Sequence, residues 1–341
     1  MEIIPTVRAA FLRLAMFLDI ANVVQPILSV AICITTLGIA MEVVGLPFSW
    51  YSSFFLERRF GLSKISFSKW SLSYVQRVTI VQVSWLVSGT LAYLAIDVWG
   101  TYWWLFVGAA FSMITIILTK LWPLLIVPRM RPVEPLRSDG LALKLKLLAR
   151  RAGVPVIGVN EWPVGEDSSR VNAALVGIGS TRRILISGIL LEDYSDDEIE
   201  GILAHELAHH VHHDIWKTIG CRGVVVLLAC WIAQQVLSAL VPLLKLEGLS
   251  DVGGLPILVI CVGCTLLLAS PLINLLSRLS EYRADRFAID LTGNRDAFMS
   301  GLRRFSAQNL AEQRPTAFVK WFFFSHPPVT ERLAAVSSHR S

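Results

Sequence analysis

The chain of 341 residues is too apolar for an ordinary water-soluble domain. Hydrophobic residues make up 54% of it and charged residues only 17%, whereas soluble domains average about 25% charged residues. The formal net charge of +5 fits a membrane protein with basic loops and does not require a nucleic-acid partner. The basic residues are not interleaved with exposed aromatics in a hydrophilic domain, so we expect no nucleic-acid binding.

Residues 5–25 form the first apolar segment, interrupted by Arg8, Arg13 and Asp19. They fit an amphipathic helix at the membrane surface as well as a span. Five further runs are long enough, at about 1.5 Å per residue, to cross a hydrocarbon core of about 30 Å. Only the first of the five carries a charged residue, Glu42; the runs are 26–46, 78–96, 103–119, 224–244 and 255–277.

Lysine and arginine in the loops predict the orientation of these spans. The loop at 47–77 carries five basic residues, the turn at 98–102 none, and the loop at 245–254 only Lys245. The segment from Arg129 onward is again basic. We therefore expect the loop at 47–77, the segment at 128–223 and the tail after 277 on the cytoplasmic side.

These patterns divide the chain into four parts. Residues 1–127 are an N-terminal membrane region with about three spans, 128–223 a catalytic segment, 224–277 a two-span hairpin and 278–341 a C-terminal catalytic segment. Within the second part we predict a basic amphipathic helix at 141–152, a strand at 154–159, and a β-hairpin formed by 171–177 and 182–188.

The sequence HELAHH at 205–210 carries the chemistry of the chain. His205 and His209 are four residues apart and share one face of a helix. Two imidazoles on one face can bind a single zinc ion, and the carboxylate of Glu206 can reach a water molecule on that ion. The string alone occurs by chance in roughly one such chain per hundred, and the alternative is a polar helix with solvated histidines. Ser195 followed by Glu198 predicts a capping box, which favours the helix.

A catalytic zinc site needs a third protein ligand. Two spans follow the HELAHH helix, and an even number of crossings returns the chain to the side that it left. The next residues include Glu281 and Asp285, four apart on one helical face. Glu281 can complete a His-His-Glu site, and Asp285 can accept a hydrogen bond from the far nitrogen of a ligand histidine. Taken alone, Glu281 fits a solvated charge at the end of a membrane helix better than a metal ligand.

Three C-terminal motifs resemble the type I CAAX prenyl endopeptidases and the related heat-shock-type membrane zinc proteases. They are ILAHELAHH at 202–210, SRLSEYRAD at 277–285 and SHPPVTERL at 325–333. Upstream, VNAALVG at 171–177 with RRILISGILL at 182–191 resembles the family's substrate-binding strand pair. LPFSWYSSFFLERRFGLSK at 46–64 resembles a segment typical of the CAAX branch.

The resemblance implies a mainly α, multi-span membrane bundle with an embedded gluzincin-type zinc protease domain that carries a small β-hairpin or sheet. It implies one zinc ion per chain, catalysis by Glu206 as general base on a zinc-bound water, and membrane lipids and a peptide or protein, which can be lipid-modified, as partners. The residues it assigns are the zinc ligands His205, His209 and Glu281, the outer partner Asp285, His326 and Arg332 near the substrate carbonyl, and Asn172, Ala173 and Ala174 along the substrate main chain.

Three functions remain open at this point. The first is a protease that trims a defined class of substrate, such as a lipid-modified C-terminus, and the segment at 46–64 favours it. The second is a heat-shock-type quality-control protease of membrane proteins. The third, of another class, is an inactive membrane scaffold with a zinc site, which the complete set of ligands, base and oxyanion groups disfavours.

Overall fold

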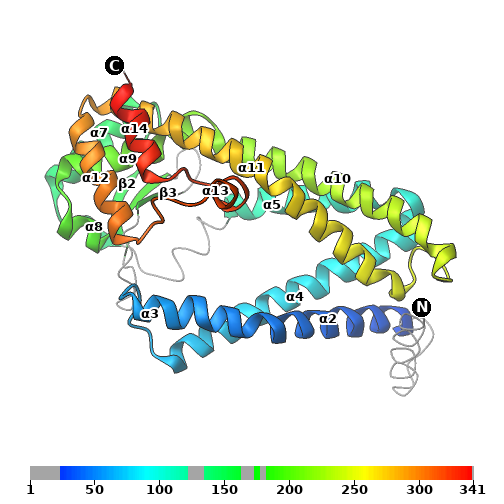
Figure 1. Ribbon diagram of the computed structural model, residues 1–341. Helices are drawn as coiled ribbons and strands as arrows, with labels where there is room; N and C mark the ends of the chain where they lie inside the picture. The colour runs from blue at the N-terminus through cyan, green and yellow to red at the C-terminus, as the bar shows by residue number, and fades with distance from the viewer. Residues whose placement is uncertain (1–23, 122–133, 163–172, 177–181, 340–341) are drawn as a thin grey trace. The chain divides into compact units, whose positions relative to one another are not determined.

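The computed structural model describes residues 24–121, 134–162, 173–176 and 182–339 (Figure 1). Helices dominate these residues, and one small sheet accompanies them. The chain divides into two compact units. The first comprises residues within 1–60, 65–113 and 223–268, and the second comprises residues within 61–64, 114–222 and 269–341. The expected helical membrane fold with a small sheet is confirmed.

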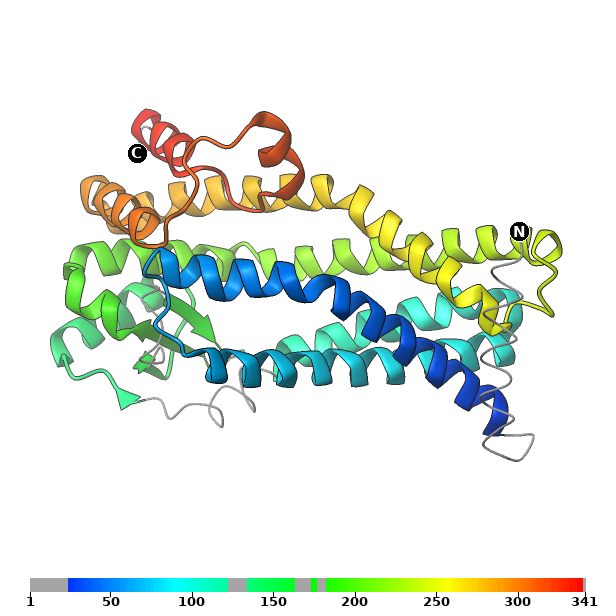
Figure 2. The same ribbon diagram turned by 60° about the horizontal axis from the view of Figure 1, so that its bottom comes forward.

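Long apolar helices build the first unit, and three of them continue into the second. The five spans predicted after residue 25 fall in helices, apart from Leu244. Four stretches of the described residues are long and apolar enough to cross a membrane, and one of them contains α4 and most of α5. Helices α2 and α4 lie side by side (Figure 2). The helices are α2 Val24–Trp50, α4 Phe67–Trp99, α5 Trp103–Leu121, α10 Asp214–Leu243 and α11 Leu255–Thr292, with the short turns η1 Tyr51–Leu56, α3 Glu57–Arg59, η2 Gly100–Tyr102 and η5 Val252–Gly254. Most of residues 5–25 lies outside the described residues.

Polar side chains inside the first unit are paired, as an apolar surrounding requires. The indole N–H of Trp103 donates to Oε1 of Gln234 at 2.5 Å, and the amide of Gln234 donates to Ser238 at 2.7 Å. Large apolar side chains on the outside stay exposed, for example Val44 at 68% and Val98 at 70%. This inverted distribution is that of a surface in contact with lipid.

The second unit holds a four-stranded sheet of order β1-β2-β4-β3. Strands β2 and β4 run parallel, whereas β3 pairs antiparallel with β4, Ala174 opposite Leu185. The predicted hairpin is therefore confirmed, while residues 177–181 between its strands lie outside the described residues. Among the described strands, β3 forms one edge of the sheet. The strands are β1 Glu134–Pro135, β2 Gly158–Trp162, β3 Ala173–Val176 and β4 Arg183–Ser187.

The strand predicted at 154–159 is mostly wrong, because β2 begins only at Gly158. The helix before this strand is α7, Asp139–Arg151, and the residues between α7 and β2 form its C-terminal cap. Gly153 has a φ of +70°, and the N–H of Val154 donates back to the carbonyl of Ala149 at 2.9 Å. A glycine in the left-handed region commonly ends a helix in this way, so Val154 belongs to the helix cap.

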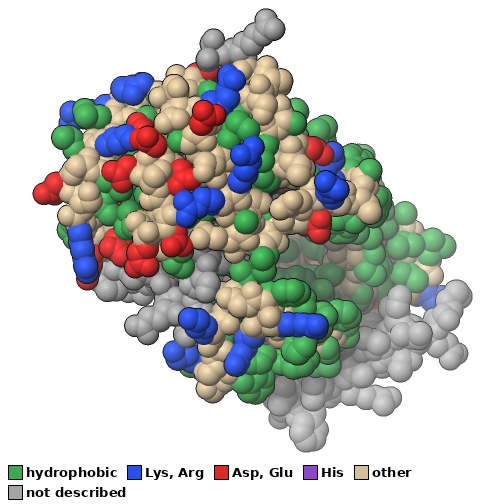
Figure 3. Space-filling model, turned by 60° about the vertical axis from the view of Figure 1, so that its left-hand side comes forward, with side chains coloured by type: hydrophobic (Ala, Val, Ile, Leu, Met, Phe, Trp, Pro, Cys, Tyr) green, Lys and Arg blue, Asp and Glu red, His purple; other side chains and the backbone are tan. Residues whose placement is uncertain are grey.

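Helices pack around the sheet to form the core of the second unit. The predicted amphipathic helix at 141–152 is confirmed as α7, which buries Leu141, Leu145 and Leu148. Figure 3, viewed from the end that carries α7, α8 and α12, shows acidic and basic side chains mixed over that end. The remaining helices are α8 Gly188–Asp193, α9 Asp196–Val211, α12 Arg295–Gln308, α13 Ala317–Phe323 and α14 Val329–Ser338.

Candidate active site

Helix α9 begins at the predicted capping box. The hydroxyl of Ser195 accepts a hydrogen bond from the N–H of Glu198 at 3.3 Å, and the N–H of Ser195 donates to Oε2 of Glu198 at 2.9 Å. From α12, Ser300 donates to Oε1 of Glu198 at 2.6 Å and Arg304 to its Oε2 at 3.0 Å. The start of α9 is thereby fixed, and the two histidines follow on its third and fourth turns.

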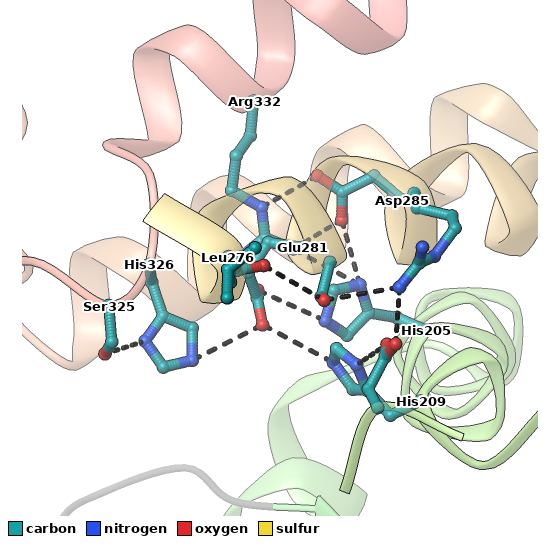
Figure 4. A network of polar contacts seen from close by, with 11 residues as sticks. His205, His209, Leu276, Glu281, Asp285, Ser325, His326 and Arg332 are labelled. Atoms are coloured by element: carbon teal, nitrogen blue, oxygen red, sulfur yellow. Dashed lines mark hydrogen bonds and ion pairs between the residues drawn. The ribbon is translucent and has the colours of Figure 1, made fainter. Parts of the chain in front are cut away.

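The two histidines point their Nε2 atoms at one carboxylate (Figure 4). Nε2 of His205 lies 3.4 Å from Oε2 of Glu281, and Nε2 of His209 lies 3.4 Å from Oε1. Glu281 is only 4% exposed and sits on α11, which continues without a break from the apolar run 255–277. The fold thus brings residues 76 positions apart in the chain to one point, as the even number of crossings predicted.

This group fits a zinc ion. His205, His209 and Glu281 each offer a ligand atom, and these atoms lie within 4.8 Å of one another. Two ligands that are each about 2.1 Å from a tetrahedral zinc ion are about 3.4 Å apart, which matches both His–Glu distances. Oε2 of Glu281 is buried and lies 3.3 Å from Nη1 of Arg332 and 3.4 Å from Nε2 of His205. A buried carboxylate is costly unless cationic groups or a metal ion balance its charge.

Each histidine has a second carboxylate behind it. Nδ1 of His205 lies 2.9 Å from Asp285, and Nδ1 of His209 lies 3.0 Å from Asp214. A proton held on each Nδ1 leaves each Nε2 free to bind metal. Asp285 is the partner that the sequence indicated. Asp214, which begins α10, was not identified from the sequence; Arg283 of α11 donates to its other oxygen.

The same carboxylates determine the basicity of the two imidazoles. Burial alone lowers the pKa of His205, but hydrogen bonds to Asp285 and Glu281 outweigh burial and raise it to about 9. Burial likewise lowers the pKa of His209, and Glu281 and Asp214 more than reverse this effect. The pocket is therefore strongly favourable to positive charge at the point where both Nε2 atoms meet.

Arg332 and His326 reach the same carboxylate from the C-terminal segment. The guanidinium of Arg332 donates to both oxygens of Asp285, from Nε at 2.8 Å and from Nη2 at 2.5 Å, and its Nη1 lies 3.3 Å from Glu281. The imidazole of His326 is 67% exposed and has Nε2 3.5 Å from Glu281. Ser325 contacts the other nitrogen of His326 at 3.0 Å. Arg332 is thus an internal group of the site, and His326 lies at its mouth.

These residues line a cavity of about 360 Å³. Glu206, half-buried on α9, lines it together with the three ligand residues, His326 and Arg332. The apolar part of the cavity wall is formed by Ile202, Phe298, Leu302 and Phe305. The cavity therefore combines a candidate base, a ligand set and room for an apolar group.

The predicted substrate residues are only partly described. Ala173 and Ala174 begin the edge strand β3, which packs against α9. Asn172 lies outside the described residues. Of the site residues predicted from the sequence, the structure brings together His205, Glu206, His209, Glu281, Asp285, His326 and Arg332.

A multi-span helical chain that holds two HExxH histidines and a distant glutamate around one cavity is a membrane metalloprotease. The chain belongs to peptidase family M48, whose family model matches residues 135–340. A second model, described as CAAX prenyl protease N-terminal with five membrane helices, matches residues 3–131.

Individual relatives agree with this assignment. The chain is 29% identical over 235 residues to the uncharacterized metalloprotease YhfN of Bacillus subtilis, covering 68% of this chain and 55% of that protein, so it spans little more than half of that relative. It is 25% identical over 323 residues to CAAX prenyl protease 1 of Saccharomyces cerevisiae, covering 86% and 68%. The crystal structure of S. mikatae Ste24p shares the fold, with a TM-score of 0.79 at 22% identity over 93% of this chain and 77% of that one.

Proposed function

We propose that this membrane metalloprotease is a zinc endopeptidase that resembles the CAAX prenyl proteases in chemistry and substrate class. The observation that carries the proposal is the convergence of His205, His209 and Glu281 in a cavity that Glu206 also lines. His205, His209 and Glu281 would hold one zinc ion, which when bound would activate a water molecule and polarise the scissile carbonyl.

Glu206 is the proposed general base. It follows a ligand histidine directly in the chain and faces the cavity, so its carboxylate can take a proton from the attacking water and later deliver it to the leaving amine. His326 is the proposed stabiliser of the developing oxyanion, because its exposed imidazole stands at the mouth of the cavity. Arg332 can assist by its positive charge, although its Nε and Nη2 atoms already donate hydrogen bonds to Asp285.

The edge strand β3 is the proposed seat of the substrate. A peptide can add to this edge through main-chain hydrogen bonds along Asn172, Ala173 and Ala174. This mode of binding requires an extended peptide, so cleavage is expected in flexible segments. The apolar wall of the cavity favours substrates with an apolar group near the cleaved bond.

Two observations favour lipid-modified C-termini over damaged membrane proteins as substrates. The relatives from yeast, rice and Arabidopsis are named CAAX prenyl protease 1 or its homologues. The apolar wall of Ile202, Phe298, Leu302 and Phe305 can accommodate a hydrophobic group.

The basic loop at 47–77 and the lysine-poor loop at 245–254 support a cytoplasmic location for the catalytic segments.

A peptidase assay on the purified protein tests the proposal. We expect cleavage that a chelator abolishes and added zinc restores. Glu206→Gln should retain the metal and lose about 10²–10⁴-fold in turnover, whereas Glu200→Gln, on the same helix but paired with Lys144 at 3.0 Å outside the cavity, should remain active. Full activity of Glu206→Gln would reject the assigned base, and chelator-resistant or absent cleavage would reject the zinc endopeptidase in favour of the scaffold.

The substrate class needs a separate comparison. A farnesylated peptide is measured against its unmodified twin at equal concentration in detergent. A protease that prefers lipid-modified C-termini should show a higher kcat/KM for the farnesylated peptide. Equal rates for the two peptides, together with cleavage of an unfolded membrane protein, would favour quality control instead.

A further inference from the structure

Helix α13 exposes an aromatic surface that the proposed chemistry does not use. Its sequence is AFVKWFF, and Phe318, Trp321 and Phe323 are 62%, 52% and 63% exposed. The rings of Phe318 and Phe323 contact each other, with centroids 6.5 Å apart, and large apolar side chains exposed close together usually mark a contact surface. We call these three residues the aromatic patch.

The chain fixes α13 at a defined level of α11. Asn274 donates to the carbonyl of Phe322 at 2.6 Å, and the buried Arg278 donates to the carbonyls of Phe324 at 2.6 Å and Lys320 at 3.1 Å. Arg278 thereby satisfies carbonyl groups at the C-terminal end of α13, where a positive charge is favourable. Asn274 and Arg278 stand where the uncharged run 255–277 ends, so α13 lies at the level where α11 leaves the hydrocarbon.

The direction of α13 is that of a helix lying in the membrane surface. Figure 1 shows α13 nearly end-on, whereas α11 runs across the picture, so the two helices cross at a wide angle. A helix that crosses a spanning helix in this way lies closer to the membrane plane than to its normal. Aromatic side chains are enriched at this level of a bilayer, where apolar rings meet polar headgroups.

The stretch of α11 that holds α13 also exposes apolar side chains. Leucines of the same stretch of α11 are also exposed, namely Leu272 at 55%, Leu275 at 41%, Leu276 at 46% and Leu279 at 54%. The single charge within α13, Lys320, is neutralised by Glu331 at 2.8 Å. Exposed apolar side chains therefore occur both on α13 and on the stretch of the spanning helix that holds it.

We propose that α13 is an interfacial helix and that the aromatic patch inserts between the phospholipids of the bilayer. The partner of this surface is the lipid itself. The helix ends at Phe323, and the next residues lead to Ser325 and His326 at the mouth of the cavity. Lipid contact at α13 thereby holds the His326 segment at the membrane surface. The inference depends on the membrane-spanning nature of α11 and not on the proposed peptidase reaction.

Photo-crosslinking in lipid nanodiscs tests this proposal. A benzophenone amino acid replaces Phe318 or Phe323, and in a matched control Leu143, which is 60% exposed on the amphipathic helix α7. After illumination, mass spectrometry identifies what is attached. We expect phospholipid adducts at positions 318 and 323 at least ten times more abundant than at 143. Adducts to protein alone, no adducts, or equal lipid adducts at 143 would overturn the proposal.

A second measurement uses a side chain that is already present. Nanodiscs made with lipids brominated near the headgroup quench nearby tryptophans. The wild-type emission minus that of Trp321→Phe reports Trp321 alone, and we expect this difference to be quenched at least twofold by the brominated lipids. An unquenched difference signal would show that Trp321 does not contact lipid and would contradict the insertion.

Discussion

Nδ1 of His209 lies 3.0 Å from the carboxylate of Asp214, just as Nδ1 of His205 lies 2.9 Å from Asp285. Each imidazole is thus held from behind by an acidic residue while its Nε2 faces Glu281. Asp214 is in turn held by Arg283, two residues after Glu281 on α11. The arrangement fixes the ring orientation of both histidines and favours a proton on each Nδ1 when Nε2 binds metal.

Replacing Asp214 by Ala should weaken metal binding by about 10–100-fold, since the loss of such a partner frees the ring and lowers its basicity. Zinc affinity is measured by competition with a chromophoric chelator, and circular dichroism checks the fold. Asp290→Ala is the matched control, because it removes the carboxylate 2.9 Å from His339, outside the cavity. Equal zinc affinity of Asp214→Ala and the wild type would contradict the role assigned to Asp214.

Glu281→Gln should bind far less zinc than the wild type, because a neutral amide is a poor zinc ligand. Elemental analysis of the purified variant measures this. The comparison is sharp because Glu206→Gln makes the same chemical change in the same cavity and should retain the metal. Unchanged zinc in the Glu281 variant would remove that residue from the ligand set.

His326→Ala should lower kcat by about 10²–10³-fold, the typical effect of removing one oxyanion donor. Thermal unfolding should not change, because the imidazole is 67% exposed. Ser325→Ala serves as the control, since it removes only a neighbour of Nδ1. If His326→Ala raised KM and left kcat intact, the histidine would act in binding and not on the oxyanion.

Acid should weaken the attachment of α12 to α9 through Glu198. Burial raises the pKa of Glu198, but hydrogen bonds from Ser300 and the backbone of Ser195, with the charge of Arg304, lower it below its ordinary value. A carboxyl with a depressed pKa stabilises the fold above its unfolded pKa of about 4.3, and this stabilisation is lost as the pH falls through the folded value.

Glu198→Gln should therefore lower the free energy of unfolding at pH 7 by about 1.5–3 kcal/mol, the contribution of hydrogen bonds to a charged group. The difference from the wild type should shrink below about pH 4. Chemical denaturation in detergent at several pH values measures it, with the exposed Glu192→Gln as the control. A difference that is independent of pH would show that the charge of Glu198 is not the stabilising feature.

Local sequence patterns determined much of this protein. The i, i+4 spacing placed both histidines on one face of α9, and the serine and glutamate of the capping box placed the start of that helix. The uncharged runs predicted the long helices, and their even number after α9 predicted the return of Glu281. These features follow from helical periodicity and from the thickness of a bilayer, which act on a segment whatever surrounds it.

The contact of Asp214 with His209 could not be predicted from the sequence, because it depends on the tertiary structure. It stands five residues after His209, and in an unbroken helix it would point about 140° away from that histidine. Instead α9 ends at Val211, His213 takes a left-handed φ of 56°, and Asp214 opens α10 with its carboxylate beside His209. The position of Arg332 between Asp285 and Glu281, 47 and 51 residues away, likewise depends on how α14 packs on α11. Periodicity describes one element at a time, and such contacts are made only when the chain changes direction between elements.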